Sequence, residues 1–516
     1  MADDPSKPTP PPPEAPRRSS ERGALTLMVG TLASRVSGLL RTSLLIQLFP
    51  AALTDAFLFA WKIPNLFREL LAEGALTNAF VPIYASLPKD EARRLTGALV
   101  TVLTLVNALL VALVMVGAPW LVGLLLTPDA NLDAELATTL LRLIFPVLAT
   151  VSWSALAMGV LNAEERFLAP AWAPVALNVV TIVAMLLFPG QIRVLSVAVV
   201  LGGLAQLLVQ IPALVRASLL PTWGVLWHPS LASVLLLMAP FALTTGARQI
   251  LNVVALVVLG QLPQGSITAY ENASLVLSLA LGLFSVSPAL AFYSRLSSDA
   301  ARRPEQFRQT LLAGLRFITF LTVPVGLLVL ILAEPTVFAI WRWSLAEGQA
   351  QALAFTITAL APLGLVVFPL GLNNLLLRPF YIRKHVRVPV VISSVFIGVQ
   401  VVLFSLWGPR YGIVGLSWAT VAANWVQLGV LLYWMRRDEG LELTPFFSHA
   451  LKVWAASAVA VGLALLALQS VPFPNNQLGV IFRLMVGGGV GVVVYALLTL
   501  LLGLSELRQV VKRFRR

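Results

Sequence analysis

Seven charged side chains interrupt two apolar runs near the start of the chain, at residues 25–49 and 54–84. On insertion scales each charge at the centre of a bilayer costs roughly 2.5–3.5 kcal/mol, so such residues usually serve a function. Charged, interrupted helices are how transporters line a polar cavity near the membrane midplane. This pattern therefore predicts the binding of a charged ligand inside the membrane. The seven residues are Arg35, Arg41, Asp55, Lys62, Arg68, Glu69 and Glu73.

The first run carries a polar stripe. At ~100° per residue, a helix over residues 25–49 gathers several polar residues within a sector of about 100°, with Arg35 at its edge. The residues in this sector are Ser34, Ser37, Gly38 and Arg41. One face of the helix should therefore line the polar cavity.

The charges of the second run do not pair with one another. Asp55 and Lys62 share a helix face but lie two turns, about 10.5 Å, apart, and Glu69 and Glu73 are a like-charge pair one turn apart. Their partners must come from neighbouring helices or from a ligand.

Pro64 is expected to interrupt this second helix. A proline has no N–H and crowds the carbonyl four residues earlier, which predicts a kink, and the amide of Asn65 would satisfy the backbone groups that the kink frees. About thirty residues of unbroken helix would span roughly 45 Å against a hydrocarbon core of ~30 Å, which also favours a bend.

The composition is that of a polytopic membrane protein. Hydrophobic residues make up 58% of the 516 residues and charged residues only 11%, and the mean hydropathy is +0.87. The net charge of +13 does not indicate nucleic acid, because the Lys and Arg residues lie mostly in short loops, where they set membrane topology. The chain has no cysteine, which excludes disulfides and thiol catalysis, and its three histidines are too scattered for a dense metal cluster.

The sequence shows no catalytic motif. A membrane enzyme that acts on lipid-linked substrates needs carboxylates, histidines or a metal site gathered at one interface, and the loops offer few such residues. The glycines at residues 487–489 and 491 follow no strand, so we interpret them as close helix packing rather than as a phosphate-binding loop. We therefore expect a transporter without catalytic residues, metal site or cofactor.

Fourteen apolar segments predict an all-α protein with fourteen transmembrane helices. Of the 36 lysines and arginines, 25 fall at the two termini and in the loops after even-numbered segments, against three in the other loops, which predicts that both termini are cytoplasmic. Residues 1–22, which include seven prolines, are expected to be a disordered tail. The segments are 25–49, 53–86, 96–118, 136–162, 167–188, 193–216, 231–261, 266–293, 308–333, 350–377, 388–407, 412–435, 450–470 and 479–503.

Five motifs resemble those of the MurJ (MviN) family of lipid II flippases, which belongs to the MOP transporter superfamily. They occur in the family's order and are spread over the first twelve apolar segments. The most specific is TDAFLFAWKIPNLFRELLAEGALTNAFVP at residues 54–82. The others are SRVSGLLR at 34–41, LLRLIFP at 140–146, LNAEERFLAPAWAPVALN at 161–178 and RPFYIRKHVRVP at 378–389.

The resemblance implies two six-helix lobes around a central cationic cavity lined by helices one, two, seven and eight. The lobes would be residues 23–216 and 217–440, with helices thirteen and fourteen at 441–504 forming a groove for the lipid tail and a basic cytoplasmic tail at 505–516. The substrate would be lipid II, the undecaprenyl-pyrophosphate-linked precursor of peptidoglycan, moved from the inner to the outer leaflet of the cytoplasmic membrane by alternating access.

By the same resemblance, Arg35, Arg41 and Arg68 are the cavity arginines. The fork of donors on a guanidinium matches phosphate oxygens, so these three are the expected pyrophosphate ligands, and Lys62 and Asn65 would assist them. Structural ion pairs across helices are the alternative for each arginine.

The resemblance also makes Asp55 the essential aspartate of helix two. Near the outer side, it would hold or release the gate, and we expect Pro64, Glu73 and Gly74 to serve the conformational change. The alternative for Asp55 is an N-terminal cap of its own helix.

Helix eight departs from the family pattern, because Leu275 takes the place of a cavity arginine. We expect Arg248 on helix seven to supply the missing charge and to face Arg35 and Arg41 across the cavity. The alternative is an ion pair between Arg248 and Glu271 that locks helices seven and eight.

Two further departures argue against sodium coupling. His385 stands where the family has an acid before helix eleven, and residues 231–261 contain no acid. We expect the membrane potential to drive transport.

Other functions remain as alternatives: a flippase for another polyprenyl-pyrophosphate glycan, or a non-transporting scaffold of the cell-wall machinery. A multidrug exporter of the same superfamily should prefer acidic cavity residues, which the arginines argue against. The expected partners are lipid II, membrane lipids and proteins of cell-wall synthesis or division, and the expected state is a monomer.

Overall fold

In the computed structural model, the regular structure is helical. The structure describes residues 18–71, 75–126, 130–300, 304–383, 387–474, 476–504 and 506–507, and within them there is no β-strand. Ten helical spans in these residues are long and apolar enough to cross a membrane. The prediction of an all-α, multi-pass membrane protein is confirmed.

The helices form two groups and a terminal pair. The first half comprises α1 (Arg18–Leu48), α2 (Ala51–Leu71), α3 (Ala75–Ser86), α4 (Lys89–Leu125), α5 (Ala134–Ile144), α6 (Val147–Ala163), α7 (Leu168–Leu187), α8 (Ile192–Leu208) and α9 (Ile211–Arg216). After α10 (Pro229–Gly260), the second half comprises α11 (Ser266–Leu281), the π-helical turn η1 (Gly282–Val286), α12 (Ser287–Ala300), α13 (Pro304–Ile331), α14 (Ala333–Trp341), α15 (Gln349–Leu363), the 3-10 turn η2 (Gly364–Val366), α16 (Val367–Leu376), α17 (Arg378–Ile382) and α18 (Arg387–Glu439). The terminal pair is α19 (Thr444–Ser470) and α20 (Gln477–Leu501).

Every predicted segment overlaps a helix or a short series of helices, although α14 and α17 lie almost entirely outside the predicted segments. α1 begins at Arg18, inside the stretch 1–22 that we expect to be disordered, and residues 1–17 of that stretch lie outside the described residues. The segments at 388–407 and 412–435 are the two arms of α18, which meet at Gly412, where φ is +61° and ψ is −148°. Glycine tolerates this conformation because it has no Cβ. The arrangement is consistent with fourteen membrane crossings.

α2 continues through Pro64, so the expected break does not occur at this residue, and the kink stays a prediction. α2 is helical on both sides of Pro64, from Ala51 to Leu71. A proline removes one N–H, and neighbouring helices in a membrane bundle allow that loss. Asn65 has another role, because its amide bonds the side chains of Arg68 and Glu69 instead of freed backbone groups.

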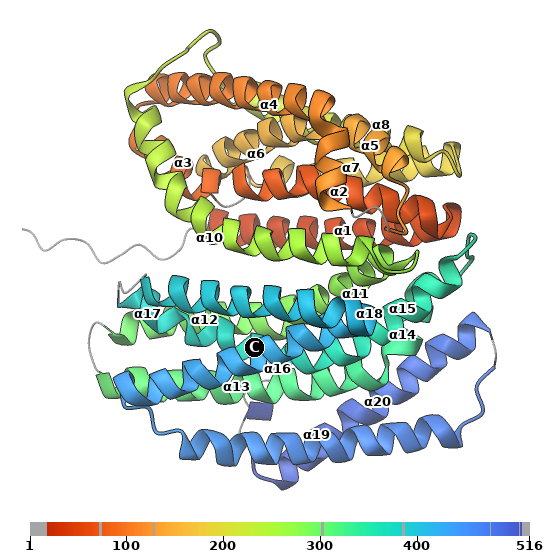
Figure 1. Ribbon diagram of the computed structural model, residues 1–516. Helices are drawn as coiled ribbons and strands as arrows, with labels where there is room; N and C mark the ends of the chain where they lie inside the picture. The colour runs from red at the N-terminus through yellow and green to blue at the C-terminus, as the bar shows by residue number, and fades with distance from the viewer. Residues whose placement is uncertain are drawn as a thin grey trace, which may run out of the picture.

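The two halves lie side by side with their helices running in similar directions (Figure 1). In this view α1–α9 form the upper group and α11–α18 the lower group. α10 runs with the upper group, and it packs against α2 and α3 as well as against α18. α10 therefore contacts both halves.

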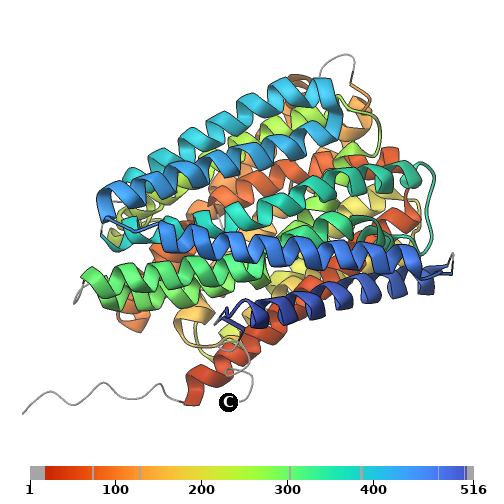
Figure 2. The ribbon, with the colours of Figure 1, turned by 90° about the horizontal axis from the view of Figure 1, so that it is seen from below.

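The terminal pair covers the outer side of the second half (Figure 2). α19 packs against α13 and α20, and α20 packs against α14. A Cβ on Gly487 would lie 2.7 Å from the side chain of Leu332, and one on Gly491 would lie 2.6 Å from that of Leu328. Real side chains do not approach this closely, so close packing is confirmed at these two glycines.

Basic residues gather at one end of the bundle. We call one end the basic end, where α3 ends and α4 begins and where Arg93, Arg94 and Arg216 lie. At the opposite end, α1 is followed by α2 and α10 by α11.

Candidate functional site

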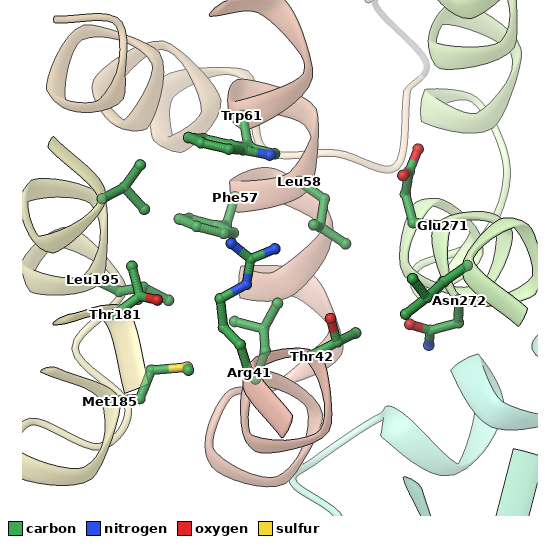
Figure 3. A pocket seen from close by; sticks show the side chains of 13 residues that line it. Arg41, Thr42, Phe57, Leu58, Trp61, Thr181, Met185, Leu195, Glu271 and Asn272 are labelled. Atoms are coloured by element: carbon green, nitrogen blue, oxygen red, sulfur yellow. The ribbon is translucent and has the colours of Figure 1, made fainter. Parts of the chain in front are cut away.

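Arg41 lies in a cavity of about 160 Å³ between α1, α2, α7, α8 and α11. In Figure 3 its side chain lies between a wall from α7 and α8, which includes Thr181, and a wall from α11, which includes Glu271 and Asn272. The cavity is therefore bounded by both halves of the molecule.

Arg41 differs from several polar neighbours in having no partner. Thr42 and Thr181 each donate their hydroxyl to a backbone carbonyl one turn earlier, and Glu271 accepts a hydrogen bond from Lys62. Arg41 forms no hydrogen bond or ion pair with any residue that the structure describes. An uncompensated charge at membrane depth is costly, so Arg41 is available to an anionic ligand.

Lys62 links the two halves beside this cavity. Its Nζ lies 2.5 Å from Oε1 of Glu271, which joins α2 to α11. The partner of Lys62 thus comes from a neighbouring helix, as the spacing in the second run requires. Among the described residues, Glu271 pairs with Lys62 and forms no ion pair with Arg248. The side chains of Lys62 and Glu271 are 21% and 34% exposed, so the pair is only partly shielded.

Only part of the polar stripe on α1 faces the cavity. Nδ2 of Asn178 on α7 donates to Oγ of Ser37 at 2.9 Å and to the carbonyl of Ser34 at 3.3 Å. These two serines therefore contribute to the contact between α1 and α7. Of the residues in the predicted stripe, Arg41 is the one among the described lining residues of this cavity.

Arg35 reaches the second half at a different place. It lies on α1 about 9 Å nearer the basic end than Arg41. A Cβ on Gly282 would lie 2.9 Å from Nη1 and 3.1 Å from Nη2 of Arg35, so the guanidinium packs directly on this glycine. Gly282 begins η1, and its carbonyl accepts the hydroxyl of Ser287 at 2.9 Å. π-helical turns of this kind are frequent at functional sites.

Arg68 belongs to a chain of polar contacts that leads to α10. Its Nε and Nη2 donate to Oδ1 of Asn65 at 3.0 and 2.7 Å. Nδ2 of Asn65 donates to Glu69 at 2.9 Å, and the other carboxylate oxygen of Glu69 accepts from Gln249 at 2.8 Å. Arg68 lies about 9 Å nearer the basic end than Lys62, and neither Arg35 nor Arg68 is among the described residues that line the Arg41 cavity.

Asp55 caps a helix of the second half. Its buried carboxylate accepts from the N–H of Gly265 at 2.6 Å, from the N–H of Thr268 at 2.9 Å and from the Thr268 hydroxyl at 2.6 Å. These N–H groups lie at the start of α11, where the helix dipole also favours a negative charge. Asp55 therefore caps α11. The alternative, that Asp55 caps its own helix, does not describe this contact.

Gly265 makes this contact possible. Its φ is +92°, and a Cβ there would lie 2.9 Å from the Cβ of Ala352. Both the conformation and the close approach require glycine.

Further hydrogen bonds join the halves at the opposite end. Nε2 of Gln349 donates to the carbonyl of Phe49 at 3.0 Å and to the hydroxyl of Thr54 at 3.1 Å. The N–H of Ala51 donates to the carbonyl of Glu347 at 3.0 Å. Other bonds here join Thr54 to Thr268, Ser43 to Ile340 and Ala346 to Ile46. These contacts hold the two halves together at this end.

Leu275 lines the Arg41 cavity, and Arg248 does not. Gln249, the next residue after Arg248, bonds Glu69, which places Arg248 at the level of Arg68. This conformation therefore does not bring Arg248 to the place of Leu275. No described residue of α10, the predicted helix seven, lines the cavity, and α7 and α8 contribute in its stead.

Three predicted positions lie outside the described residues. These are Glu73 and Gly74, which we expect to serve the conformational change, and His385, which bears on sodium coupling.

The sequence reasoning missed the amide side chains that tie the helices together. Asn178 joins α7 to α1, Gln249 joins α10 to α2, and Gln349 joins α15 to the start of α2. A signal was present in each case, because an amide inside an apolar run needs a hydrogen-bond partner.

Comparisons with known proteins place the chain in a family. A family model described as lipid II flippase MurJ matches residues 46–487. The probable lipid II flippase MurJ of Bdellovibrio bacteriovorus is 32% identical over 460 residues, which cover 86% of this chain and 87% of that protein. The lipid II flippase MurJ of Burkholderia cenocepacia is 32% identical over 399 residues, which cover 74% and 76% of the two chains.

Solved structures share the fold. A structure of lipid II flippase MurJ in an inward closed conformation superposes with a TM-score of 0.79 at 22% identity and covers 93% of this chain and 99% of its own. An inward-facing multidrug MATE transporter of the MOP superfamily gives a TM-score of 0.66 at 16% identity, over 81% of this chain and 98% of its own. The family match and the curated relatives together show that the chain belongs to the MurJ family of lipid II flippases.

Proposed function

We propose that the protein flips lipid II from the inner to the outer leaflet of the cytoplasmic membrane. The curated relatives are named lipid II flippase or probable lipid II flippase. In this chain, the observation that carries the proposal is Arg41, whose guanidinium lies in a cavity bounded by both halves and has no hydrogen-bond or ion-pair partner among the described residues. A pyrophosphate cannot cross ~30 Å of hydrocarbon without charge compensation, and a guanidinium offers donors that match its oxygens.

The positions of the other cations support a stepwise path. Arg35 and Arg68 lie about one and a half helical turns nearer the basic end than Arg41 and Lys62, respectively. If the basic end faces the cytoplasm, as the loop charges indicate, the phosphates meet Arg35 and Arg68 before they reach Arg41. Asn65 then acts by orienting Arg68.

The contacts at the opposite end support alternating access. The halves are joined there through Asp55 and α11, so release to the outer leaflet requires this contact to break. We propose that the lobes at residues 23–216 and 217–440 separate there, with Asp55 as the gate residue, and that bending near Pro64, Glu73 and Gly74 accompanies the change. The cavity forms within a single chain, so we propose that a monomer suffices.

We propose that the membrane potential and not sodium drives the cycle. About 2.3 kcal/mol per charge per 100 mV is available when negative charge moves outward from a negative interior. Replacing sodium with choline in transport assays should leave the rate unchanged, and collapsing the potential should lower it. A steep dependence on sodium would contradict this part of the proposal.

Depletion in the protein's own host tests the function directly. We expect lipid II to accumulate in the inner leaflet when the protein is removed, and a plasmid copy of the wild type to reverse the accumulation. Arg193→Ala, a change at an exposed arginine at the start of α8, should reverse it equally well. Unchanged lipid II distribution after depletion would rule the function out.

A further inference from the structure

Asn272 is a buried polar residue whose side chain has no partner. It lies on α11 in the wall of the Arg41 cavity (Figure 3). Its relative exposure is 1%. Neither its Nδ2 nor its Oδ1 forms a hydrogen bond with a described residue. Buried amides are nearly always paired, because an unpaired one loses its bonds to water without replacement. Because Asn272 lines a cavity, a ligand there can supply the partner that the described residues do not.

The neighbouring side chains do not pair with Asn272 in this conformation. The hydroxyls of Thr42 and Thr181 already donate to backbone carbonyls, and Glu271 is engaged by Lys62. One turn along the same wall, Leu275 offers no polar atom. Arg41 and Asn272 thus line one cavity, and neither side chain has a hydrogen-bond partner in the part of the chain that the structure describes.

The chemistry of the two groups differs, and this difference indicates what each would bind. Arg41 has only donors and a positive charge, which suit phosphate oxygens. An amide has both donors and an acceptor. A phosphate would satisfy Nδ2 of Asn272 but would leave Oδ1 unpaired, whereas a sugar hydroxyl or an N-acyl amide satisfies both.

We propose that Asn272 binds a hydroxyl or amide group of the sugar next to the pyrophosphate while Arg41 binds the phosphates. This inference rests on the proposed function. The cavity volume of about 160 Å³ fits such a partial site. Sites for whole drug-sized ligands measure about 300–1,000 Å³, so the rest of the headgroup must lie outside this cavity. Asn272 is then a residue that distinguishes a glycan-bearing lipid from a bare pyrophosphate lipid.

The test compares two nearly isosteric substitutions in the purified full-length protein. Asn272→Leu removes the amide from the cavity wall. Asn107→Leu is the matched control, because Asn107 on α4 is also 1% exposed with both amide atoms unpaired, but it does not line the cavity. The measurements are the thermal unfolding midpoint without lipid and the affinities for lipid II and for undecaprenyl pyrophosphate, which has no sugar.

We expect both variants to unfold at the wild-type temperature or above it, because each loses an unpaired buried amide. Asn272→Leu should weaken lipid II binding about tenfold, the effect of one or two hydrogen bonds, and should leave undecaprenyl pyrophosphate binding unchanged. Asn107→Leu should bind both lipids as the wild type does.

Several results would overturn the inference. Unchanged lipid II binding by Asn272→Leu would mean that the amide binds only water, and an equal loss for both lipids would assign it to the phosphates. A lowered unfolding midpoint of Asn272→Leu alone would mean a structural role. If the wild type binds lipid II and Asn272→Leu matches it, only this inference fails. If the wild type does not bind lipid II, the proposed function fails and the inference fails with it.

Discussion

The charged residue at the opposite end of the bundle and the one in the Arg41 cavity differ in their hydrogen-bond partners. Asp55 is fully bonded, with two backbone N–H groups and one hydroxyl donating to its carboxylate across the two halves. Arg41 lies on the adjoining helix, also between the halves, and has no partner among the described residues.

This contrast separates a closing contact from a binding site. At the opposite end, the polar groups of the two halves satisfy one another, so the folded chain is complete there without a ligand. In the cavity, Arg41 of the first half and Asn272 of the second half have no hydrogen-bond partner among the described residues. Substitutions at the opposite end should therefore shift the equilibrium between conformations, whereas substitutions in the cavity should remove binding and leave the fold intact.

The largest effect should come from Arg41→Ala. We expect it to abolish lipid II transport while the protein stays folded in the membrane, because no hydrogen bond or ion pair of Arg41 with the described residues is lost. Arg41→Lys should also fail, since a point charge does not reproduce the bidentate geometry. Complementation of a depleted strain, with membrane abundance measured in parallel, checks both variants, and Arg193→Ala is the control.

Arg35→Ala and Arg68→Ala should abolish transport as well. Normal growth with any of the three alanine variants as the only copy would remove that arginine from the set of phosphate ligands. Growth with Arg41→Ala would also show that the cavity is not a binding site, so it would no longer differ in function from the opposite end.

Asp55→Asn should have the next largest effect, on the conformational equilibrium. The neutral amide loses the charged hydrogen bonds to Gly265 and Thr268, and bonds to charged groups are worth about 1.5–3 kcal/mol each. The chain lacks cysteine, so Ala51→Cys, at a buried position next to Gly348 of the other half, can report opening. Labelling by a membrane-impermeant maleimide should be at least about tenfold faster with Asp55→Asn, since 1.4 kcal/mol corresponds to a factor of ten. Equal labelling rates would show that Asp55 does not hold this end closed.

The sequence was sufficient for the helices and for the residues that carry charge within them. Long apolar runs fix the positions of membrane helices, and the cost of burying charge makes Arg41 and Asp55 conspicuous. The partners were not predictable, because they come from distant parts of the chain: Asp55 and Gly265 are 210 residues apart. Pro64 shows a second limit, since the local rule for proline did not include the packing that keeps α2 helical.

The Arg41 cavity itself was only half predictable. The two helices that carry its charges were identified, but the described lining also comes from α7 and α8 and includes no described residue of α10, the predicted helix seven. The unpaired state of Asn272 depends on where every neighbouring donor points, and no spacing rule contains that information.

Exchanging the charges of Lys62 and Glu271 should have a moderate effect. The pair is partly exposed, and such pairs contribute about 0–1 kcal/mol, so Lys62→Ala alone should barely change stability. If Lys62 only bridges the halves, Lys62→Glu combined with Glu271→Lys should transport like the wild type. If Lys62 also binds phosphate, the double variant should stay several-fold slower. Transport rates in proteoliposomes distinguish the two results.

The smallest effect should come from Leu275→Arg. On its own it adds a cation to the Arg41 cavity and should change the rate little. In combination with Arg248→Ala it should restore any transport that Arg248→Ala loses, if Arg248 supplies the charge missing from α11. Absence of rescue, with both proteins present in the membrane at equal levels, would show that Arg248 has no such role.

A structure of the protein with lipid II bound would test the central claim most directly. The account predicts the pyrophosphate within hydrogen-bonding distance of the Arg41 guanidinium, between α1 and α11, with Asp55 still bonded to the start of α11. A bound pyrophosphate elsewhere, with Arg41 paired to a protein carboxylate, would contradict it.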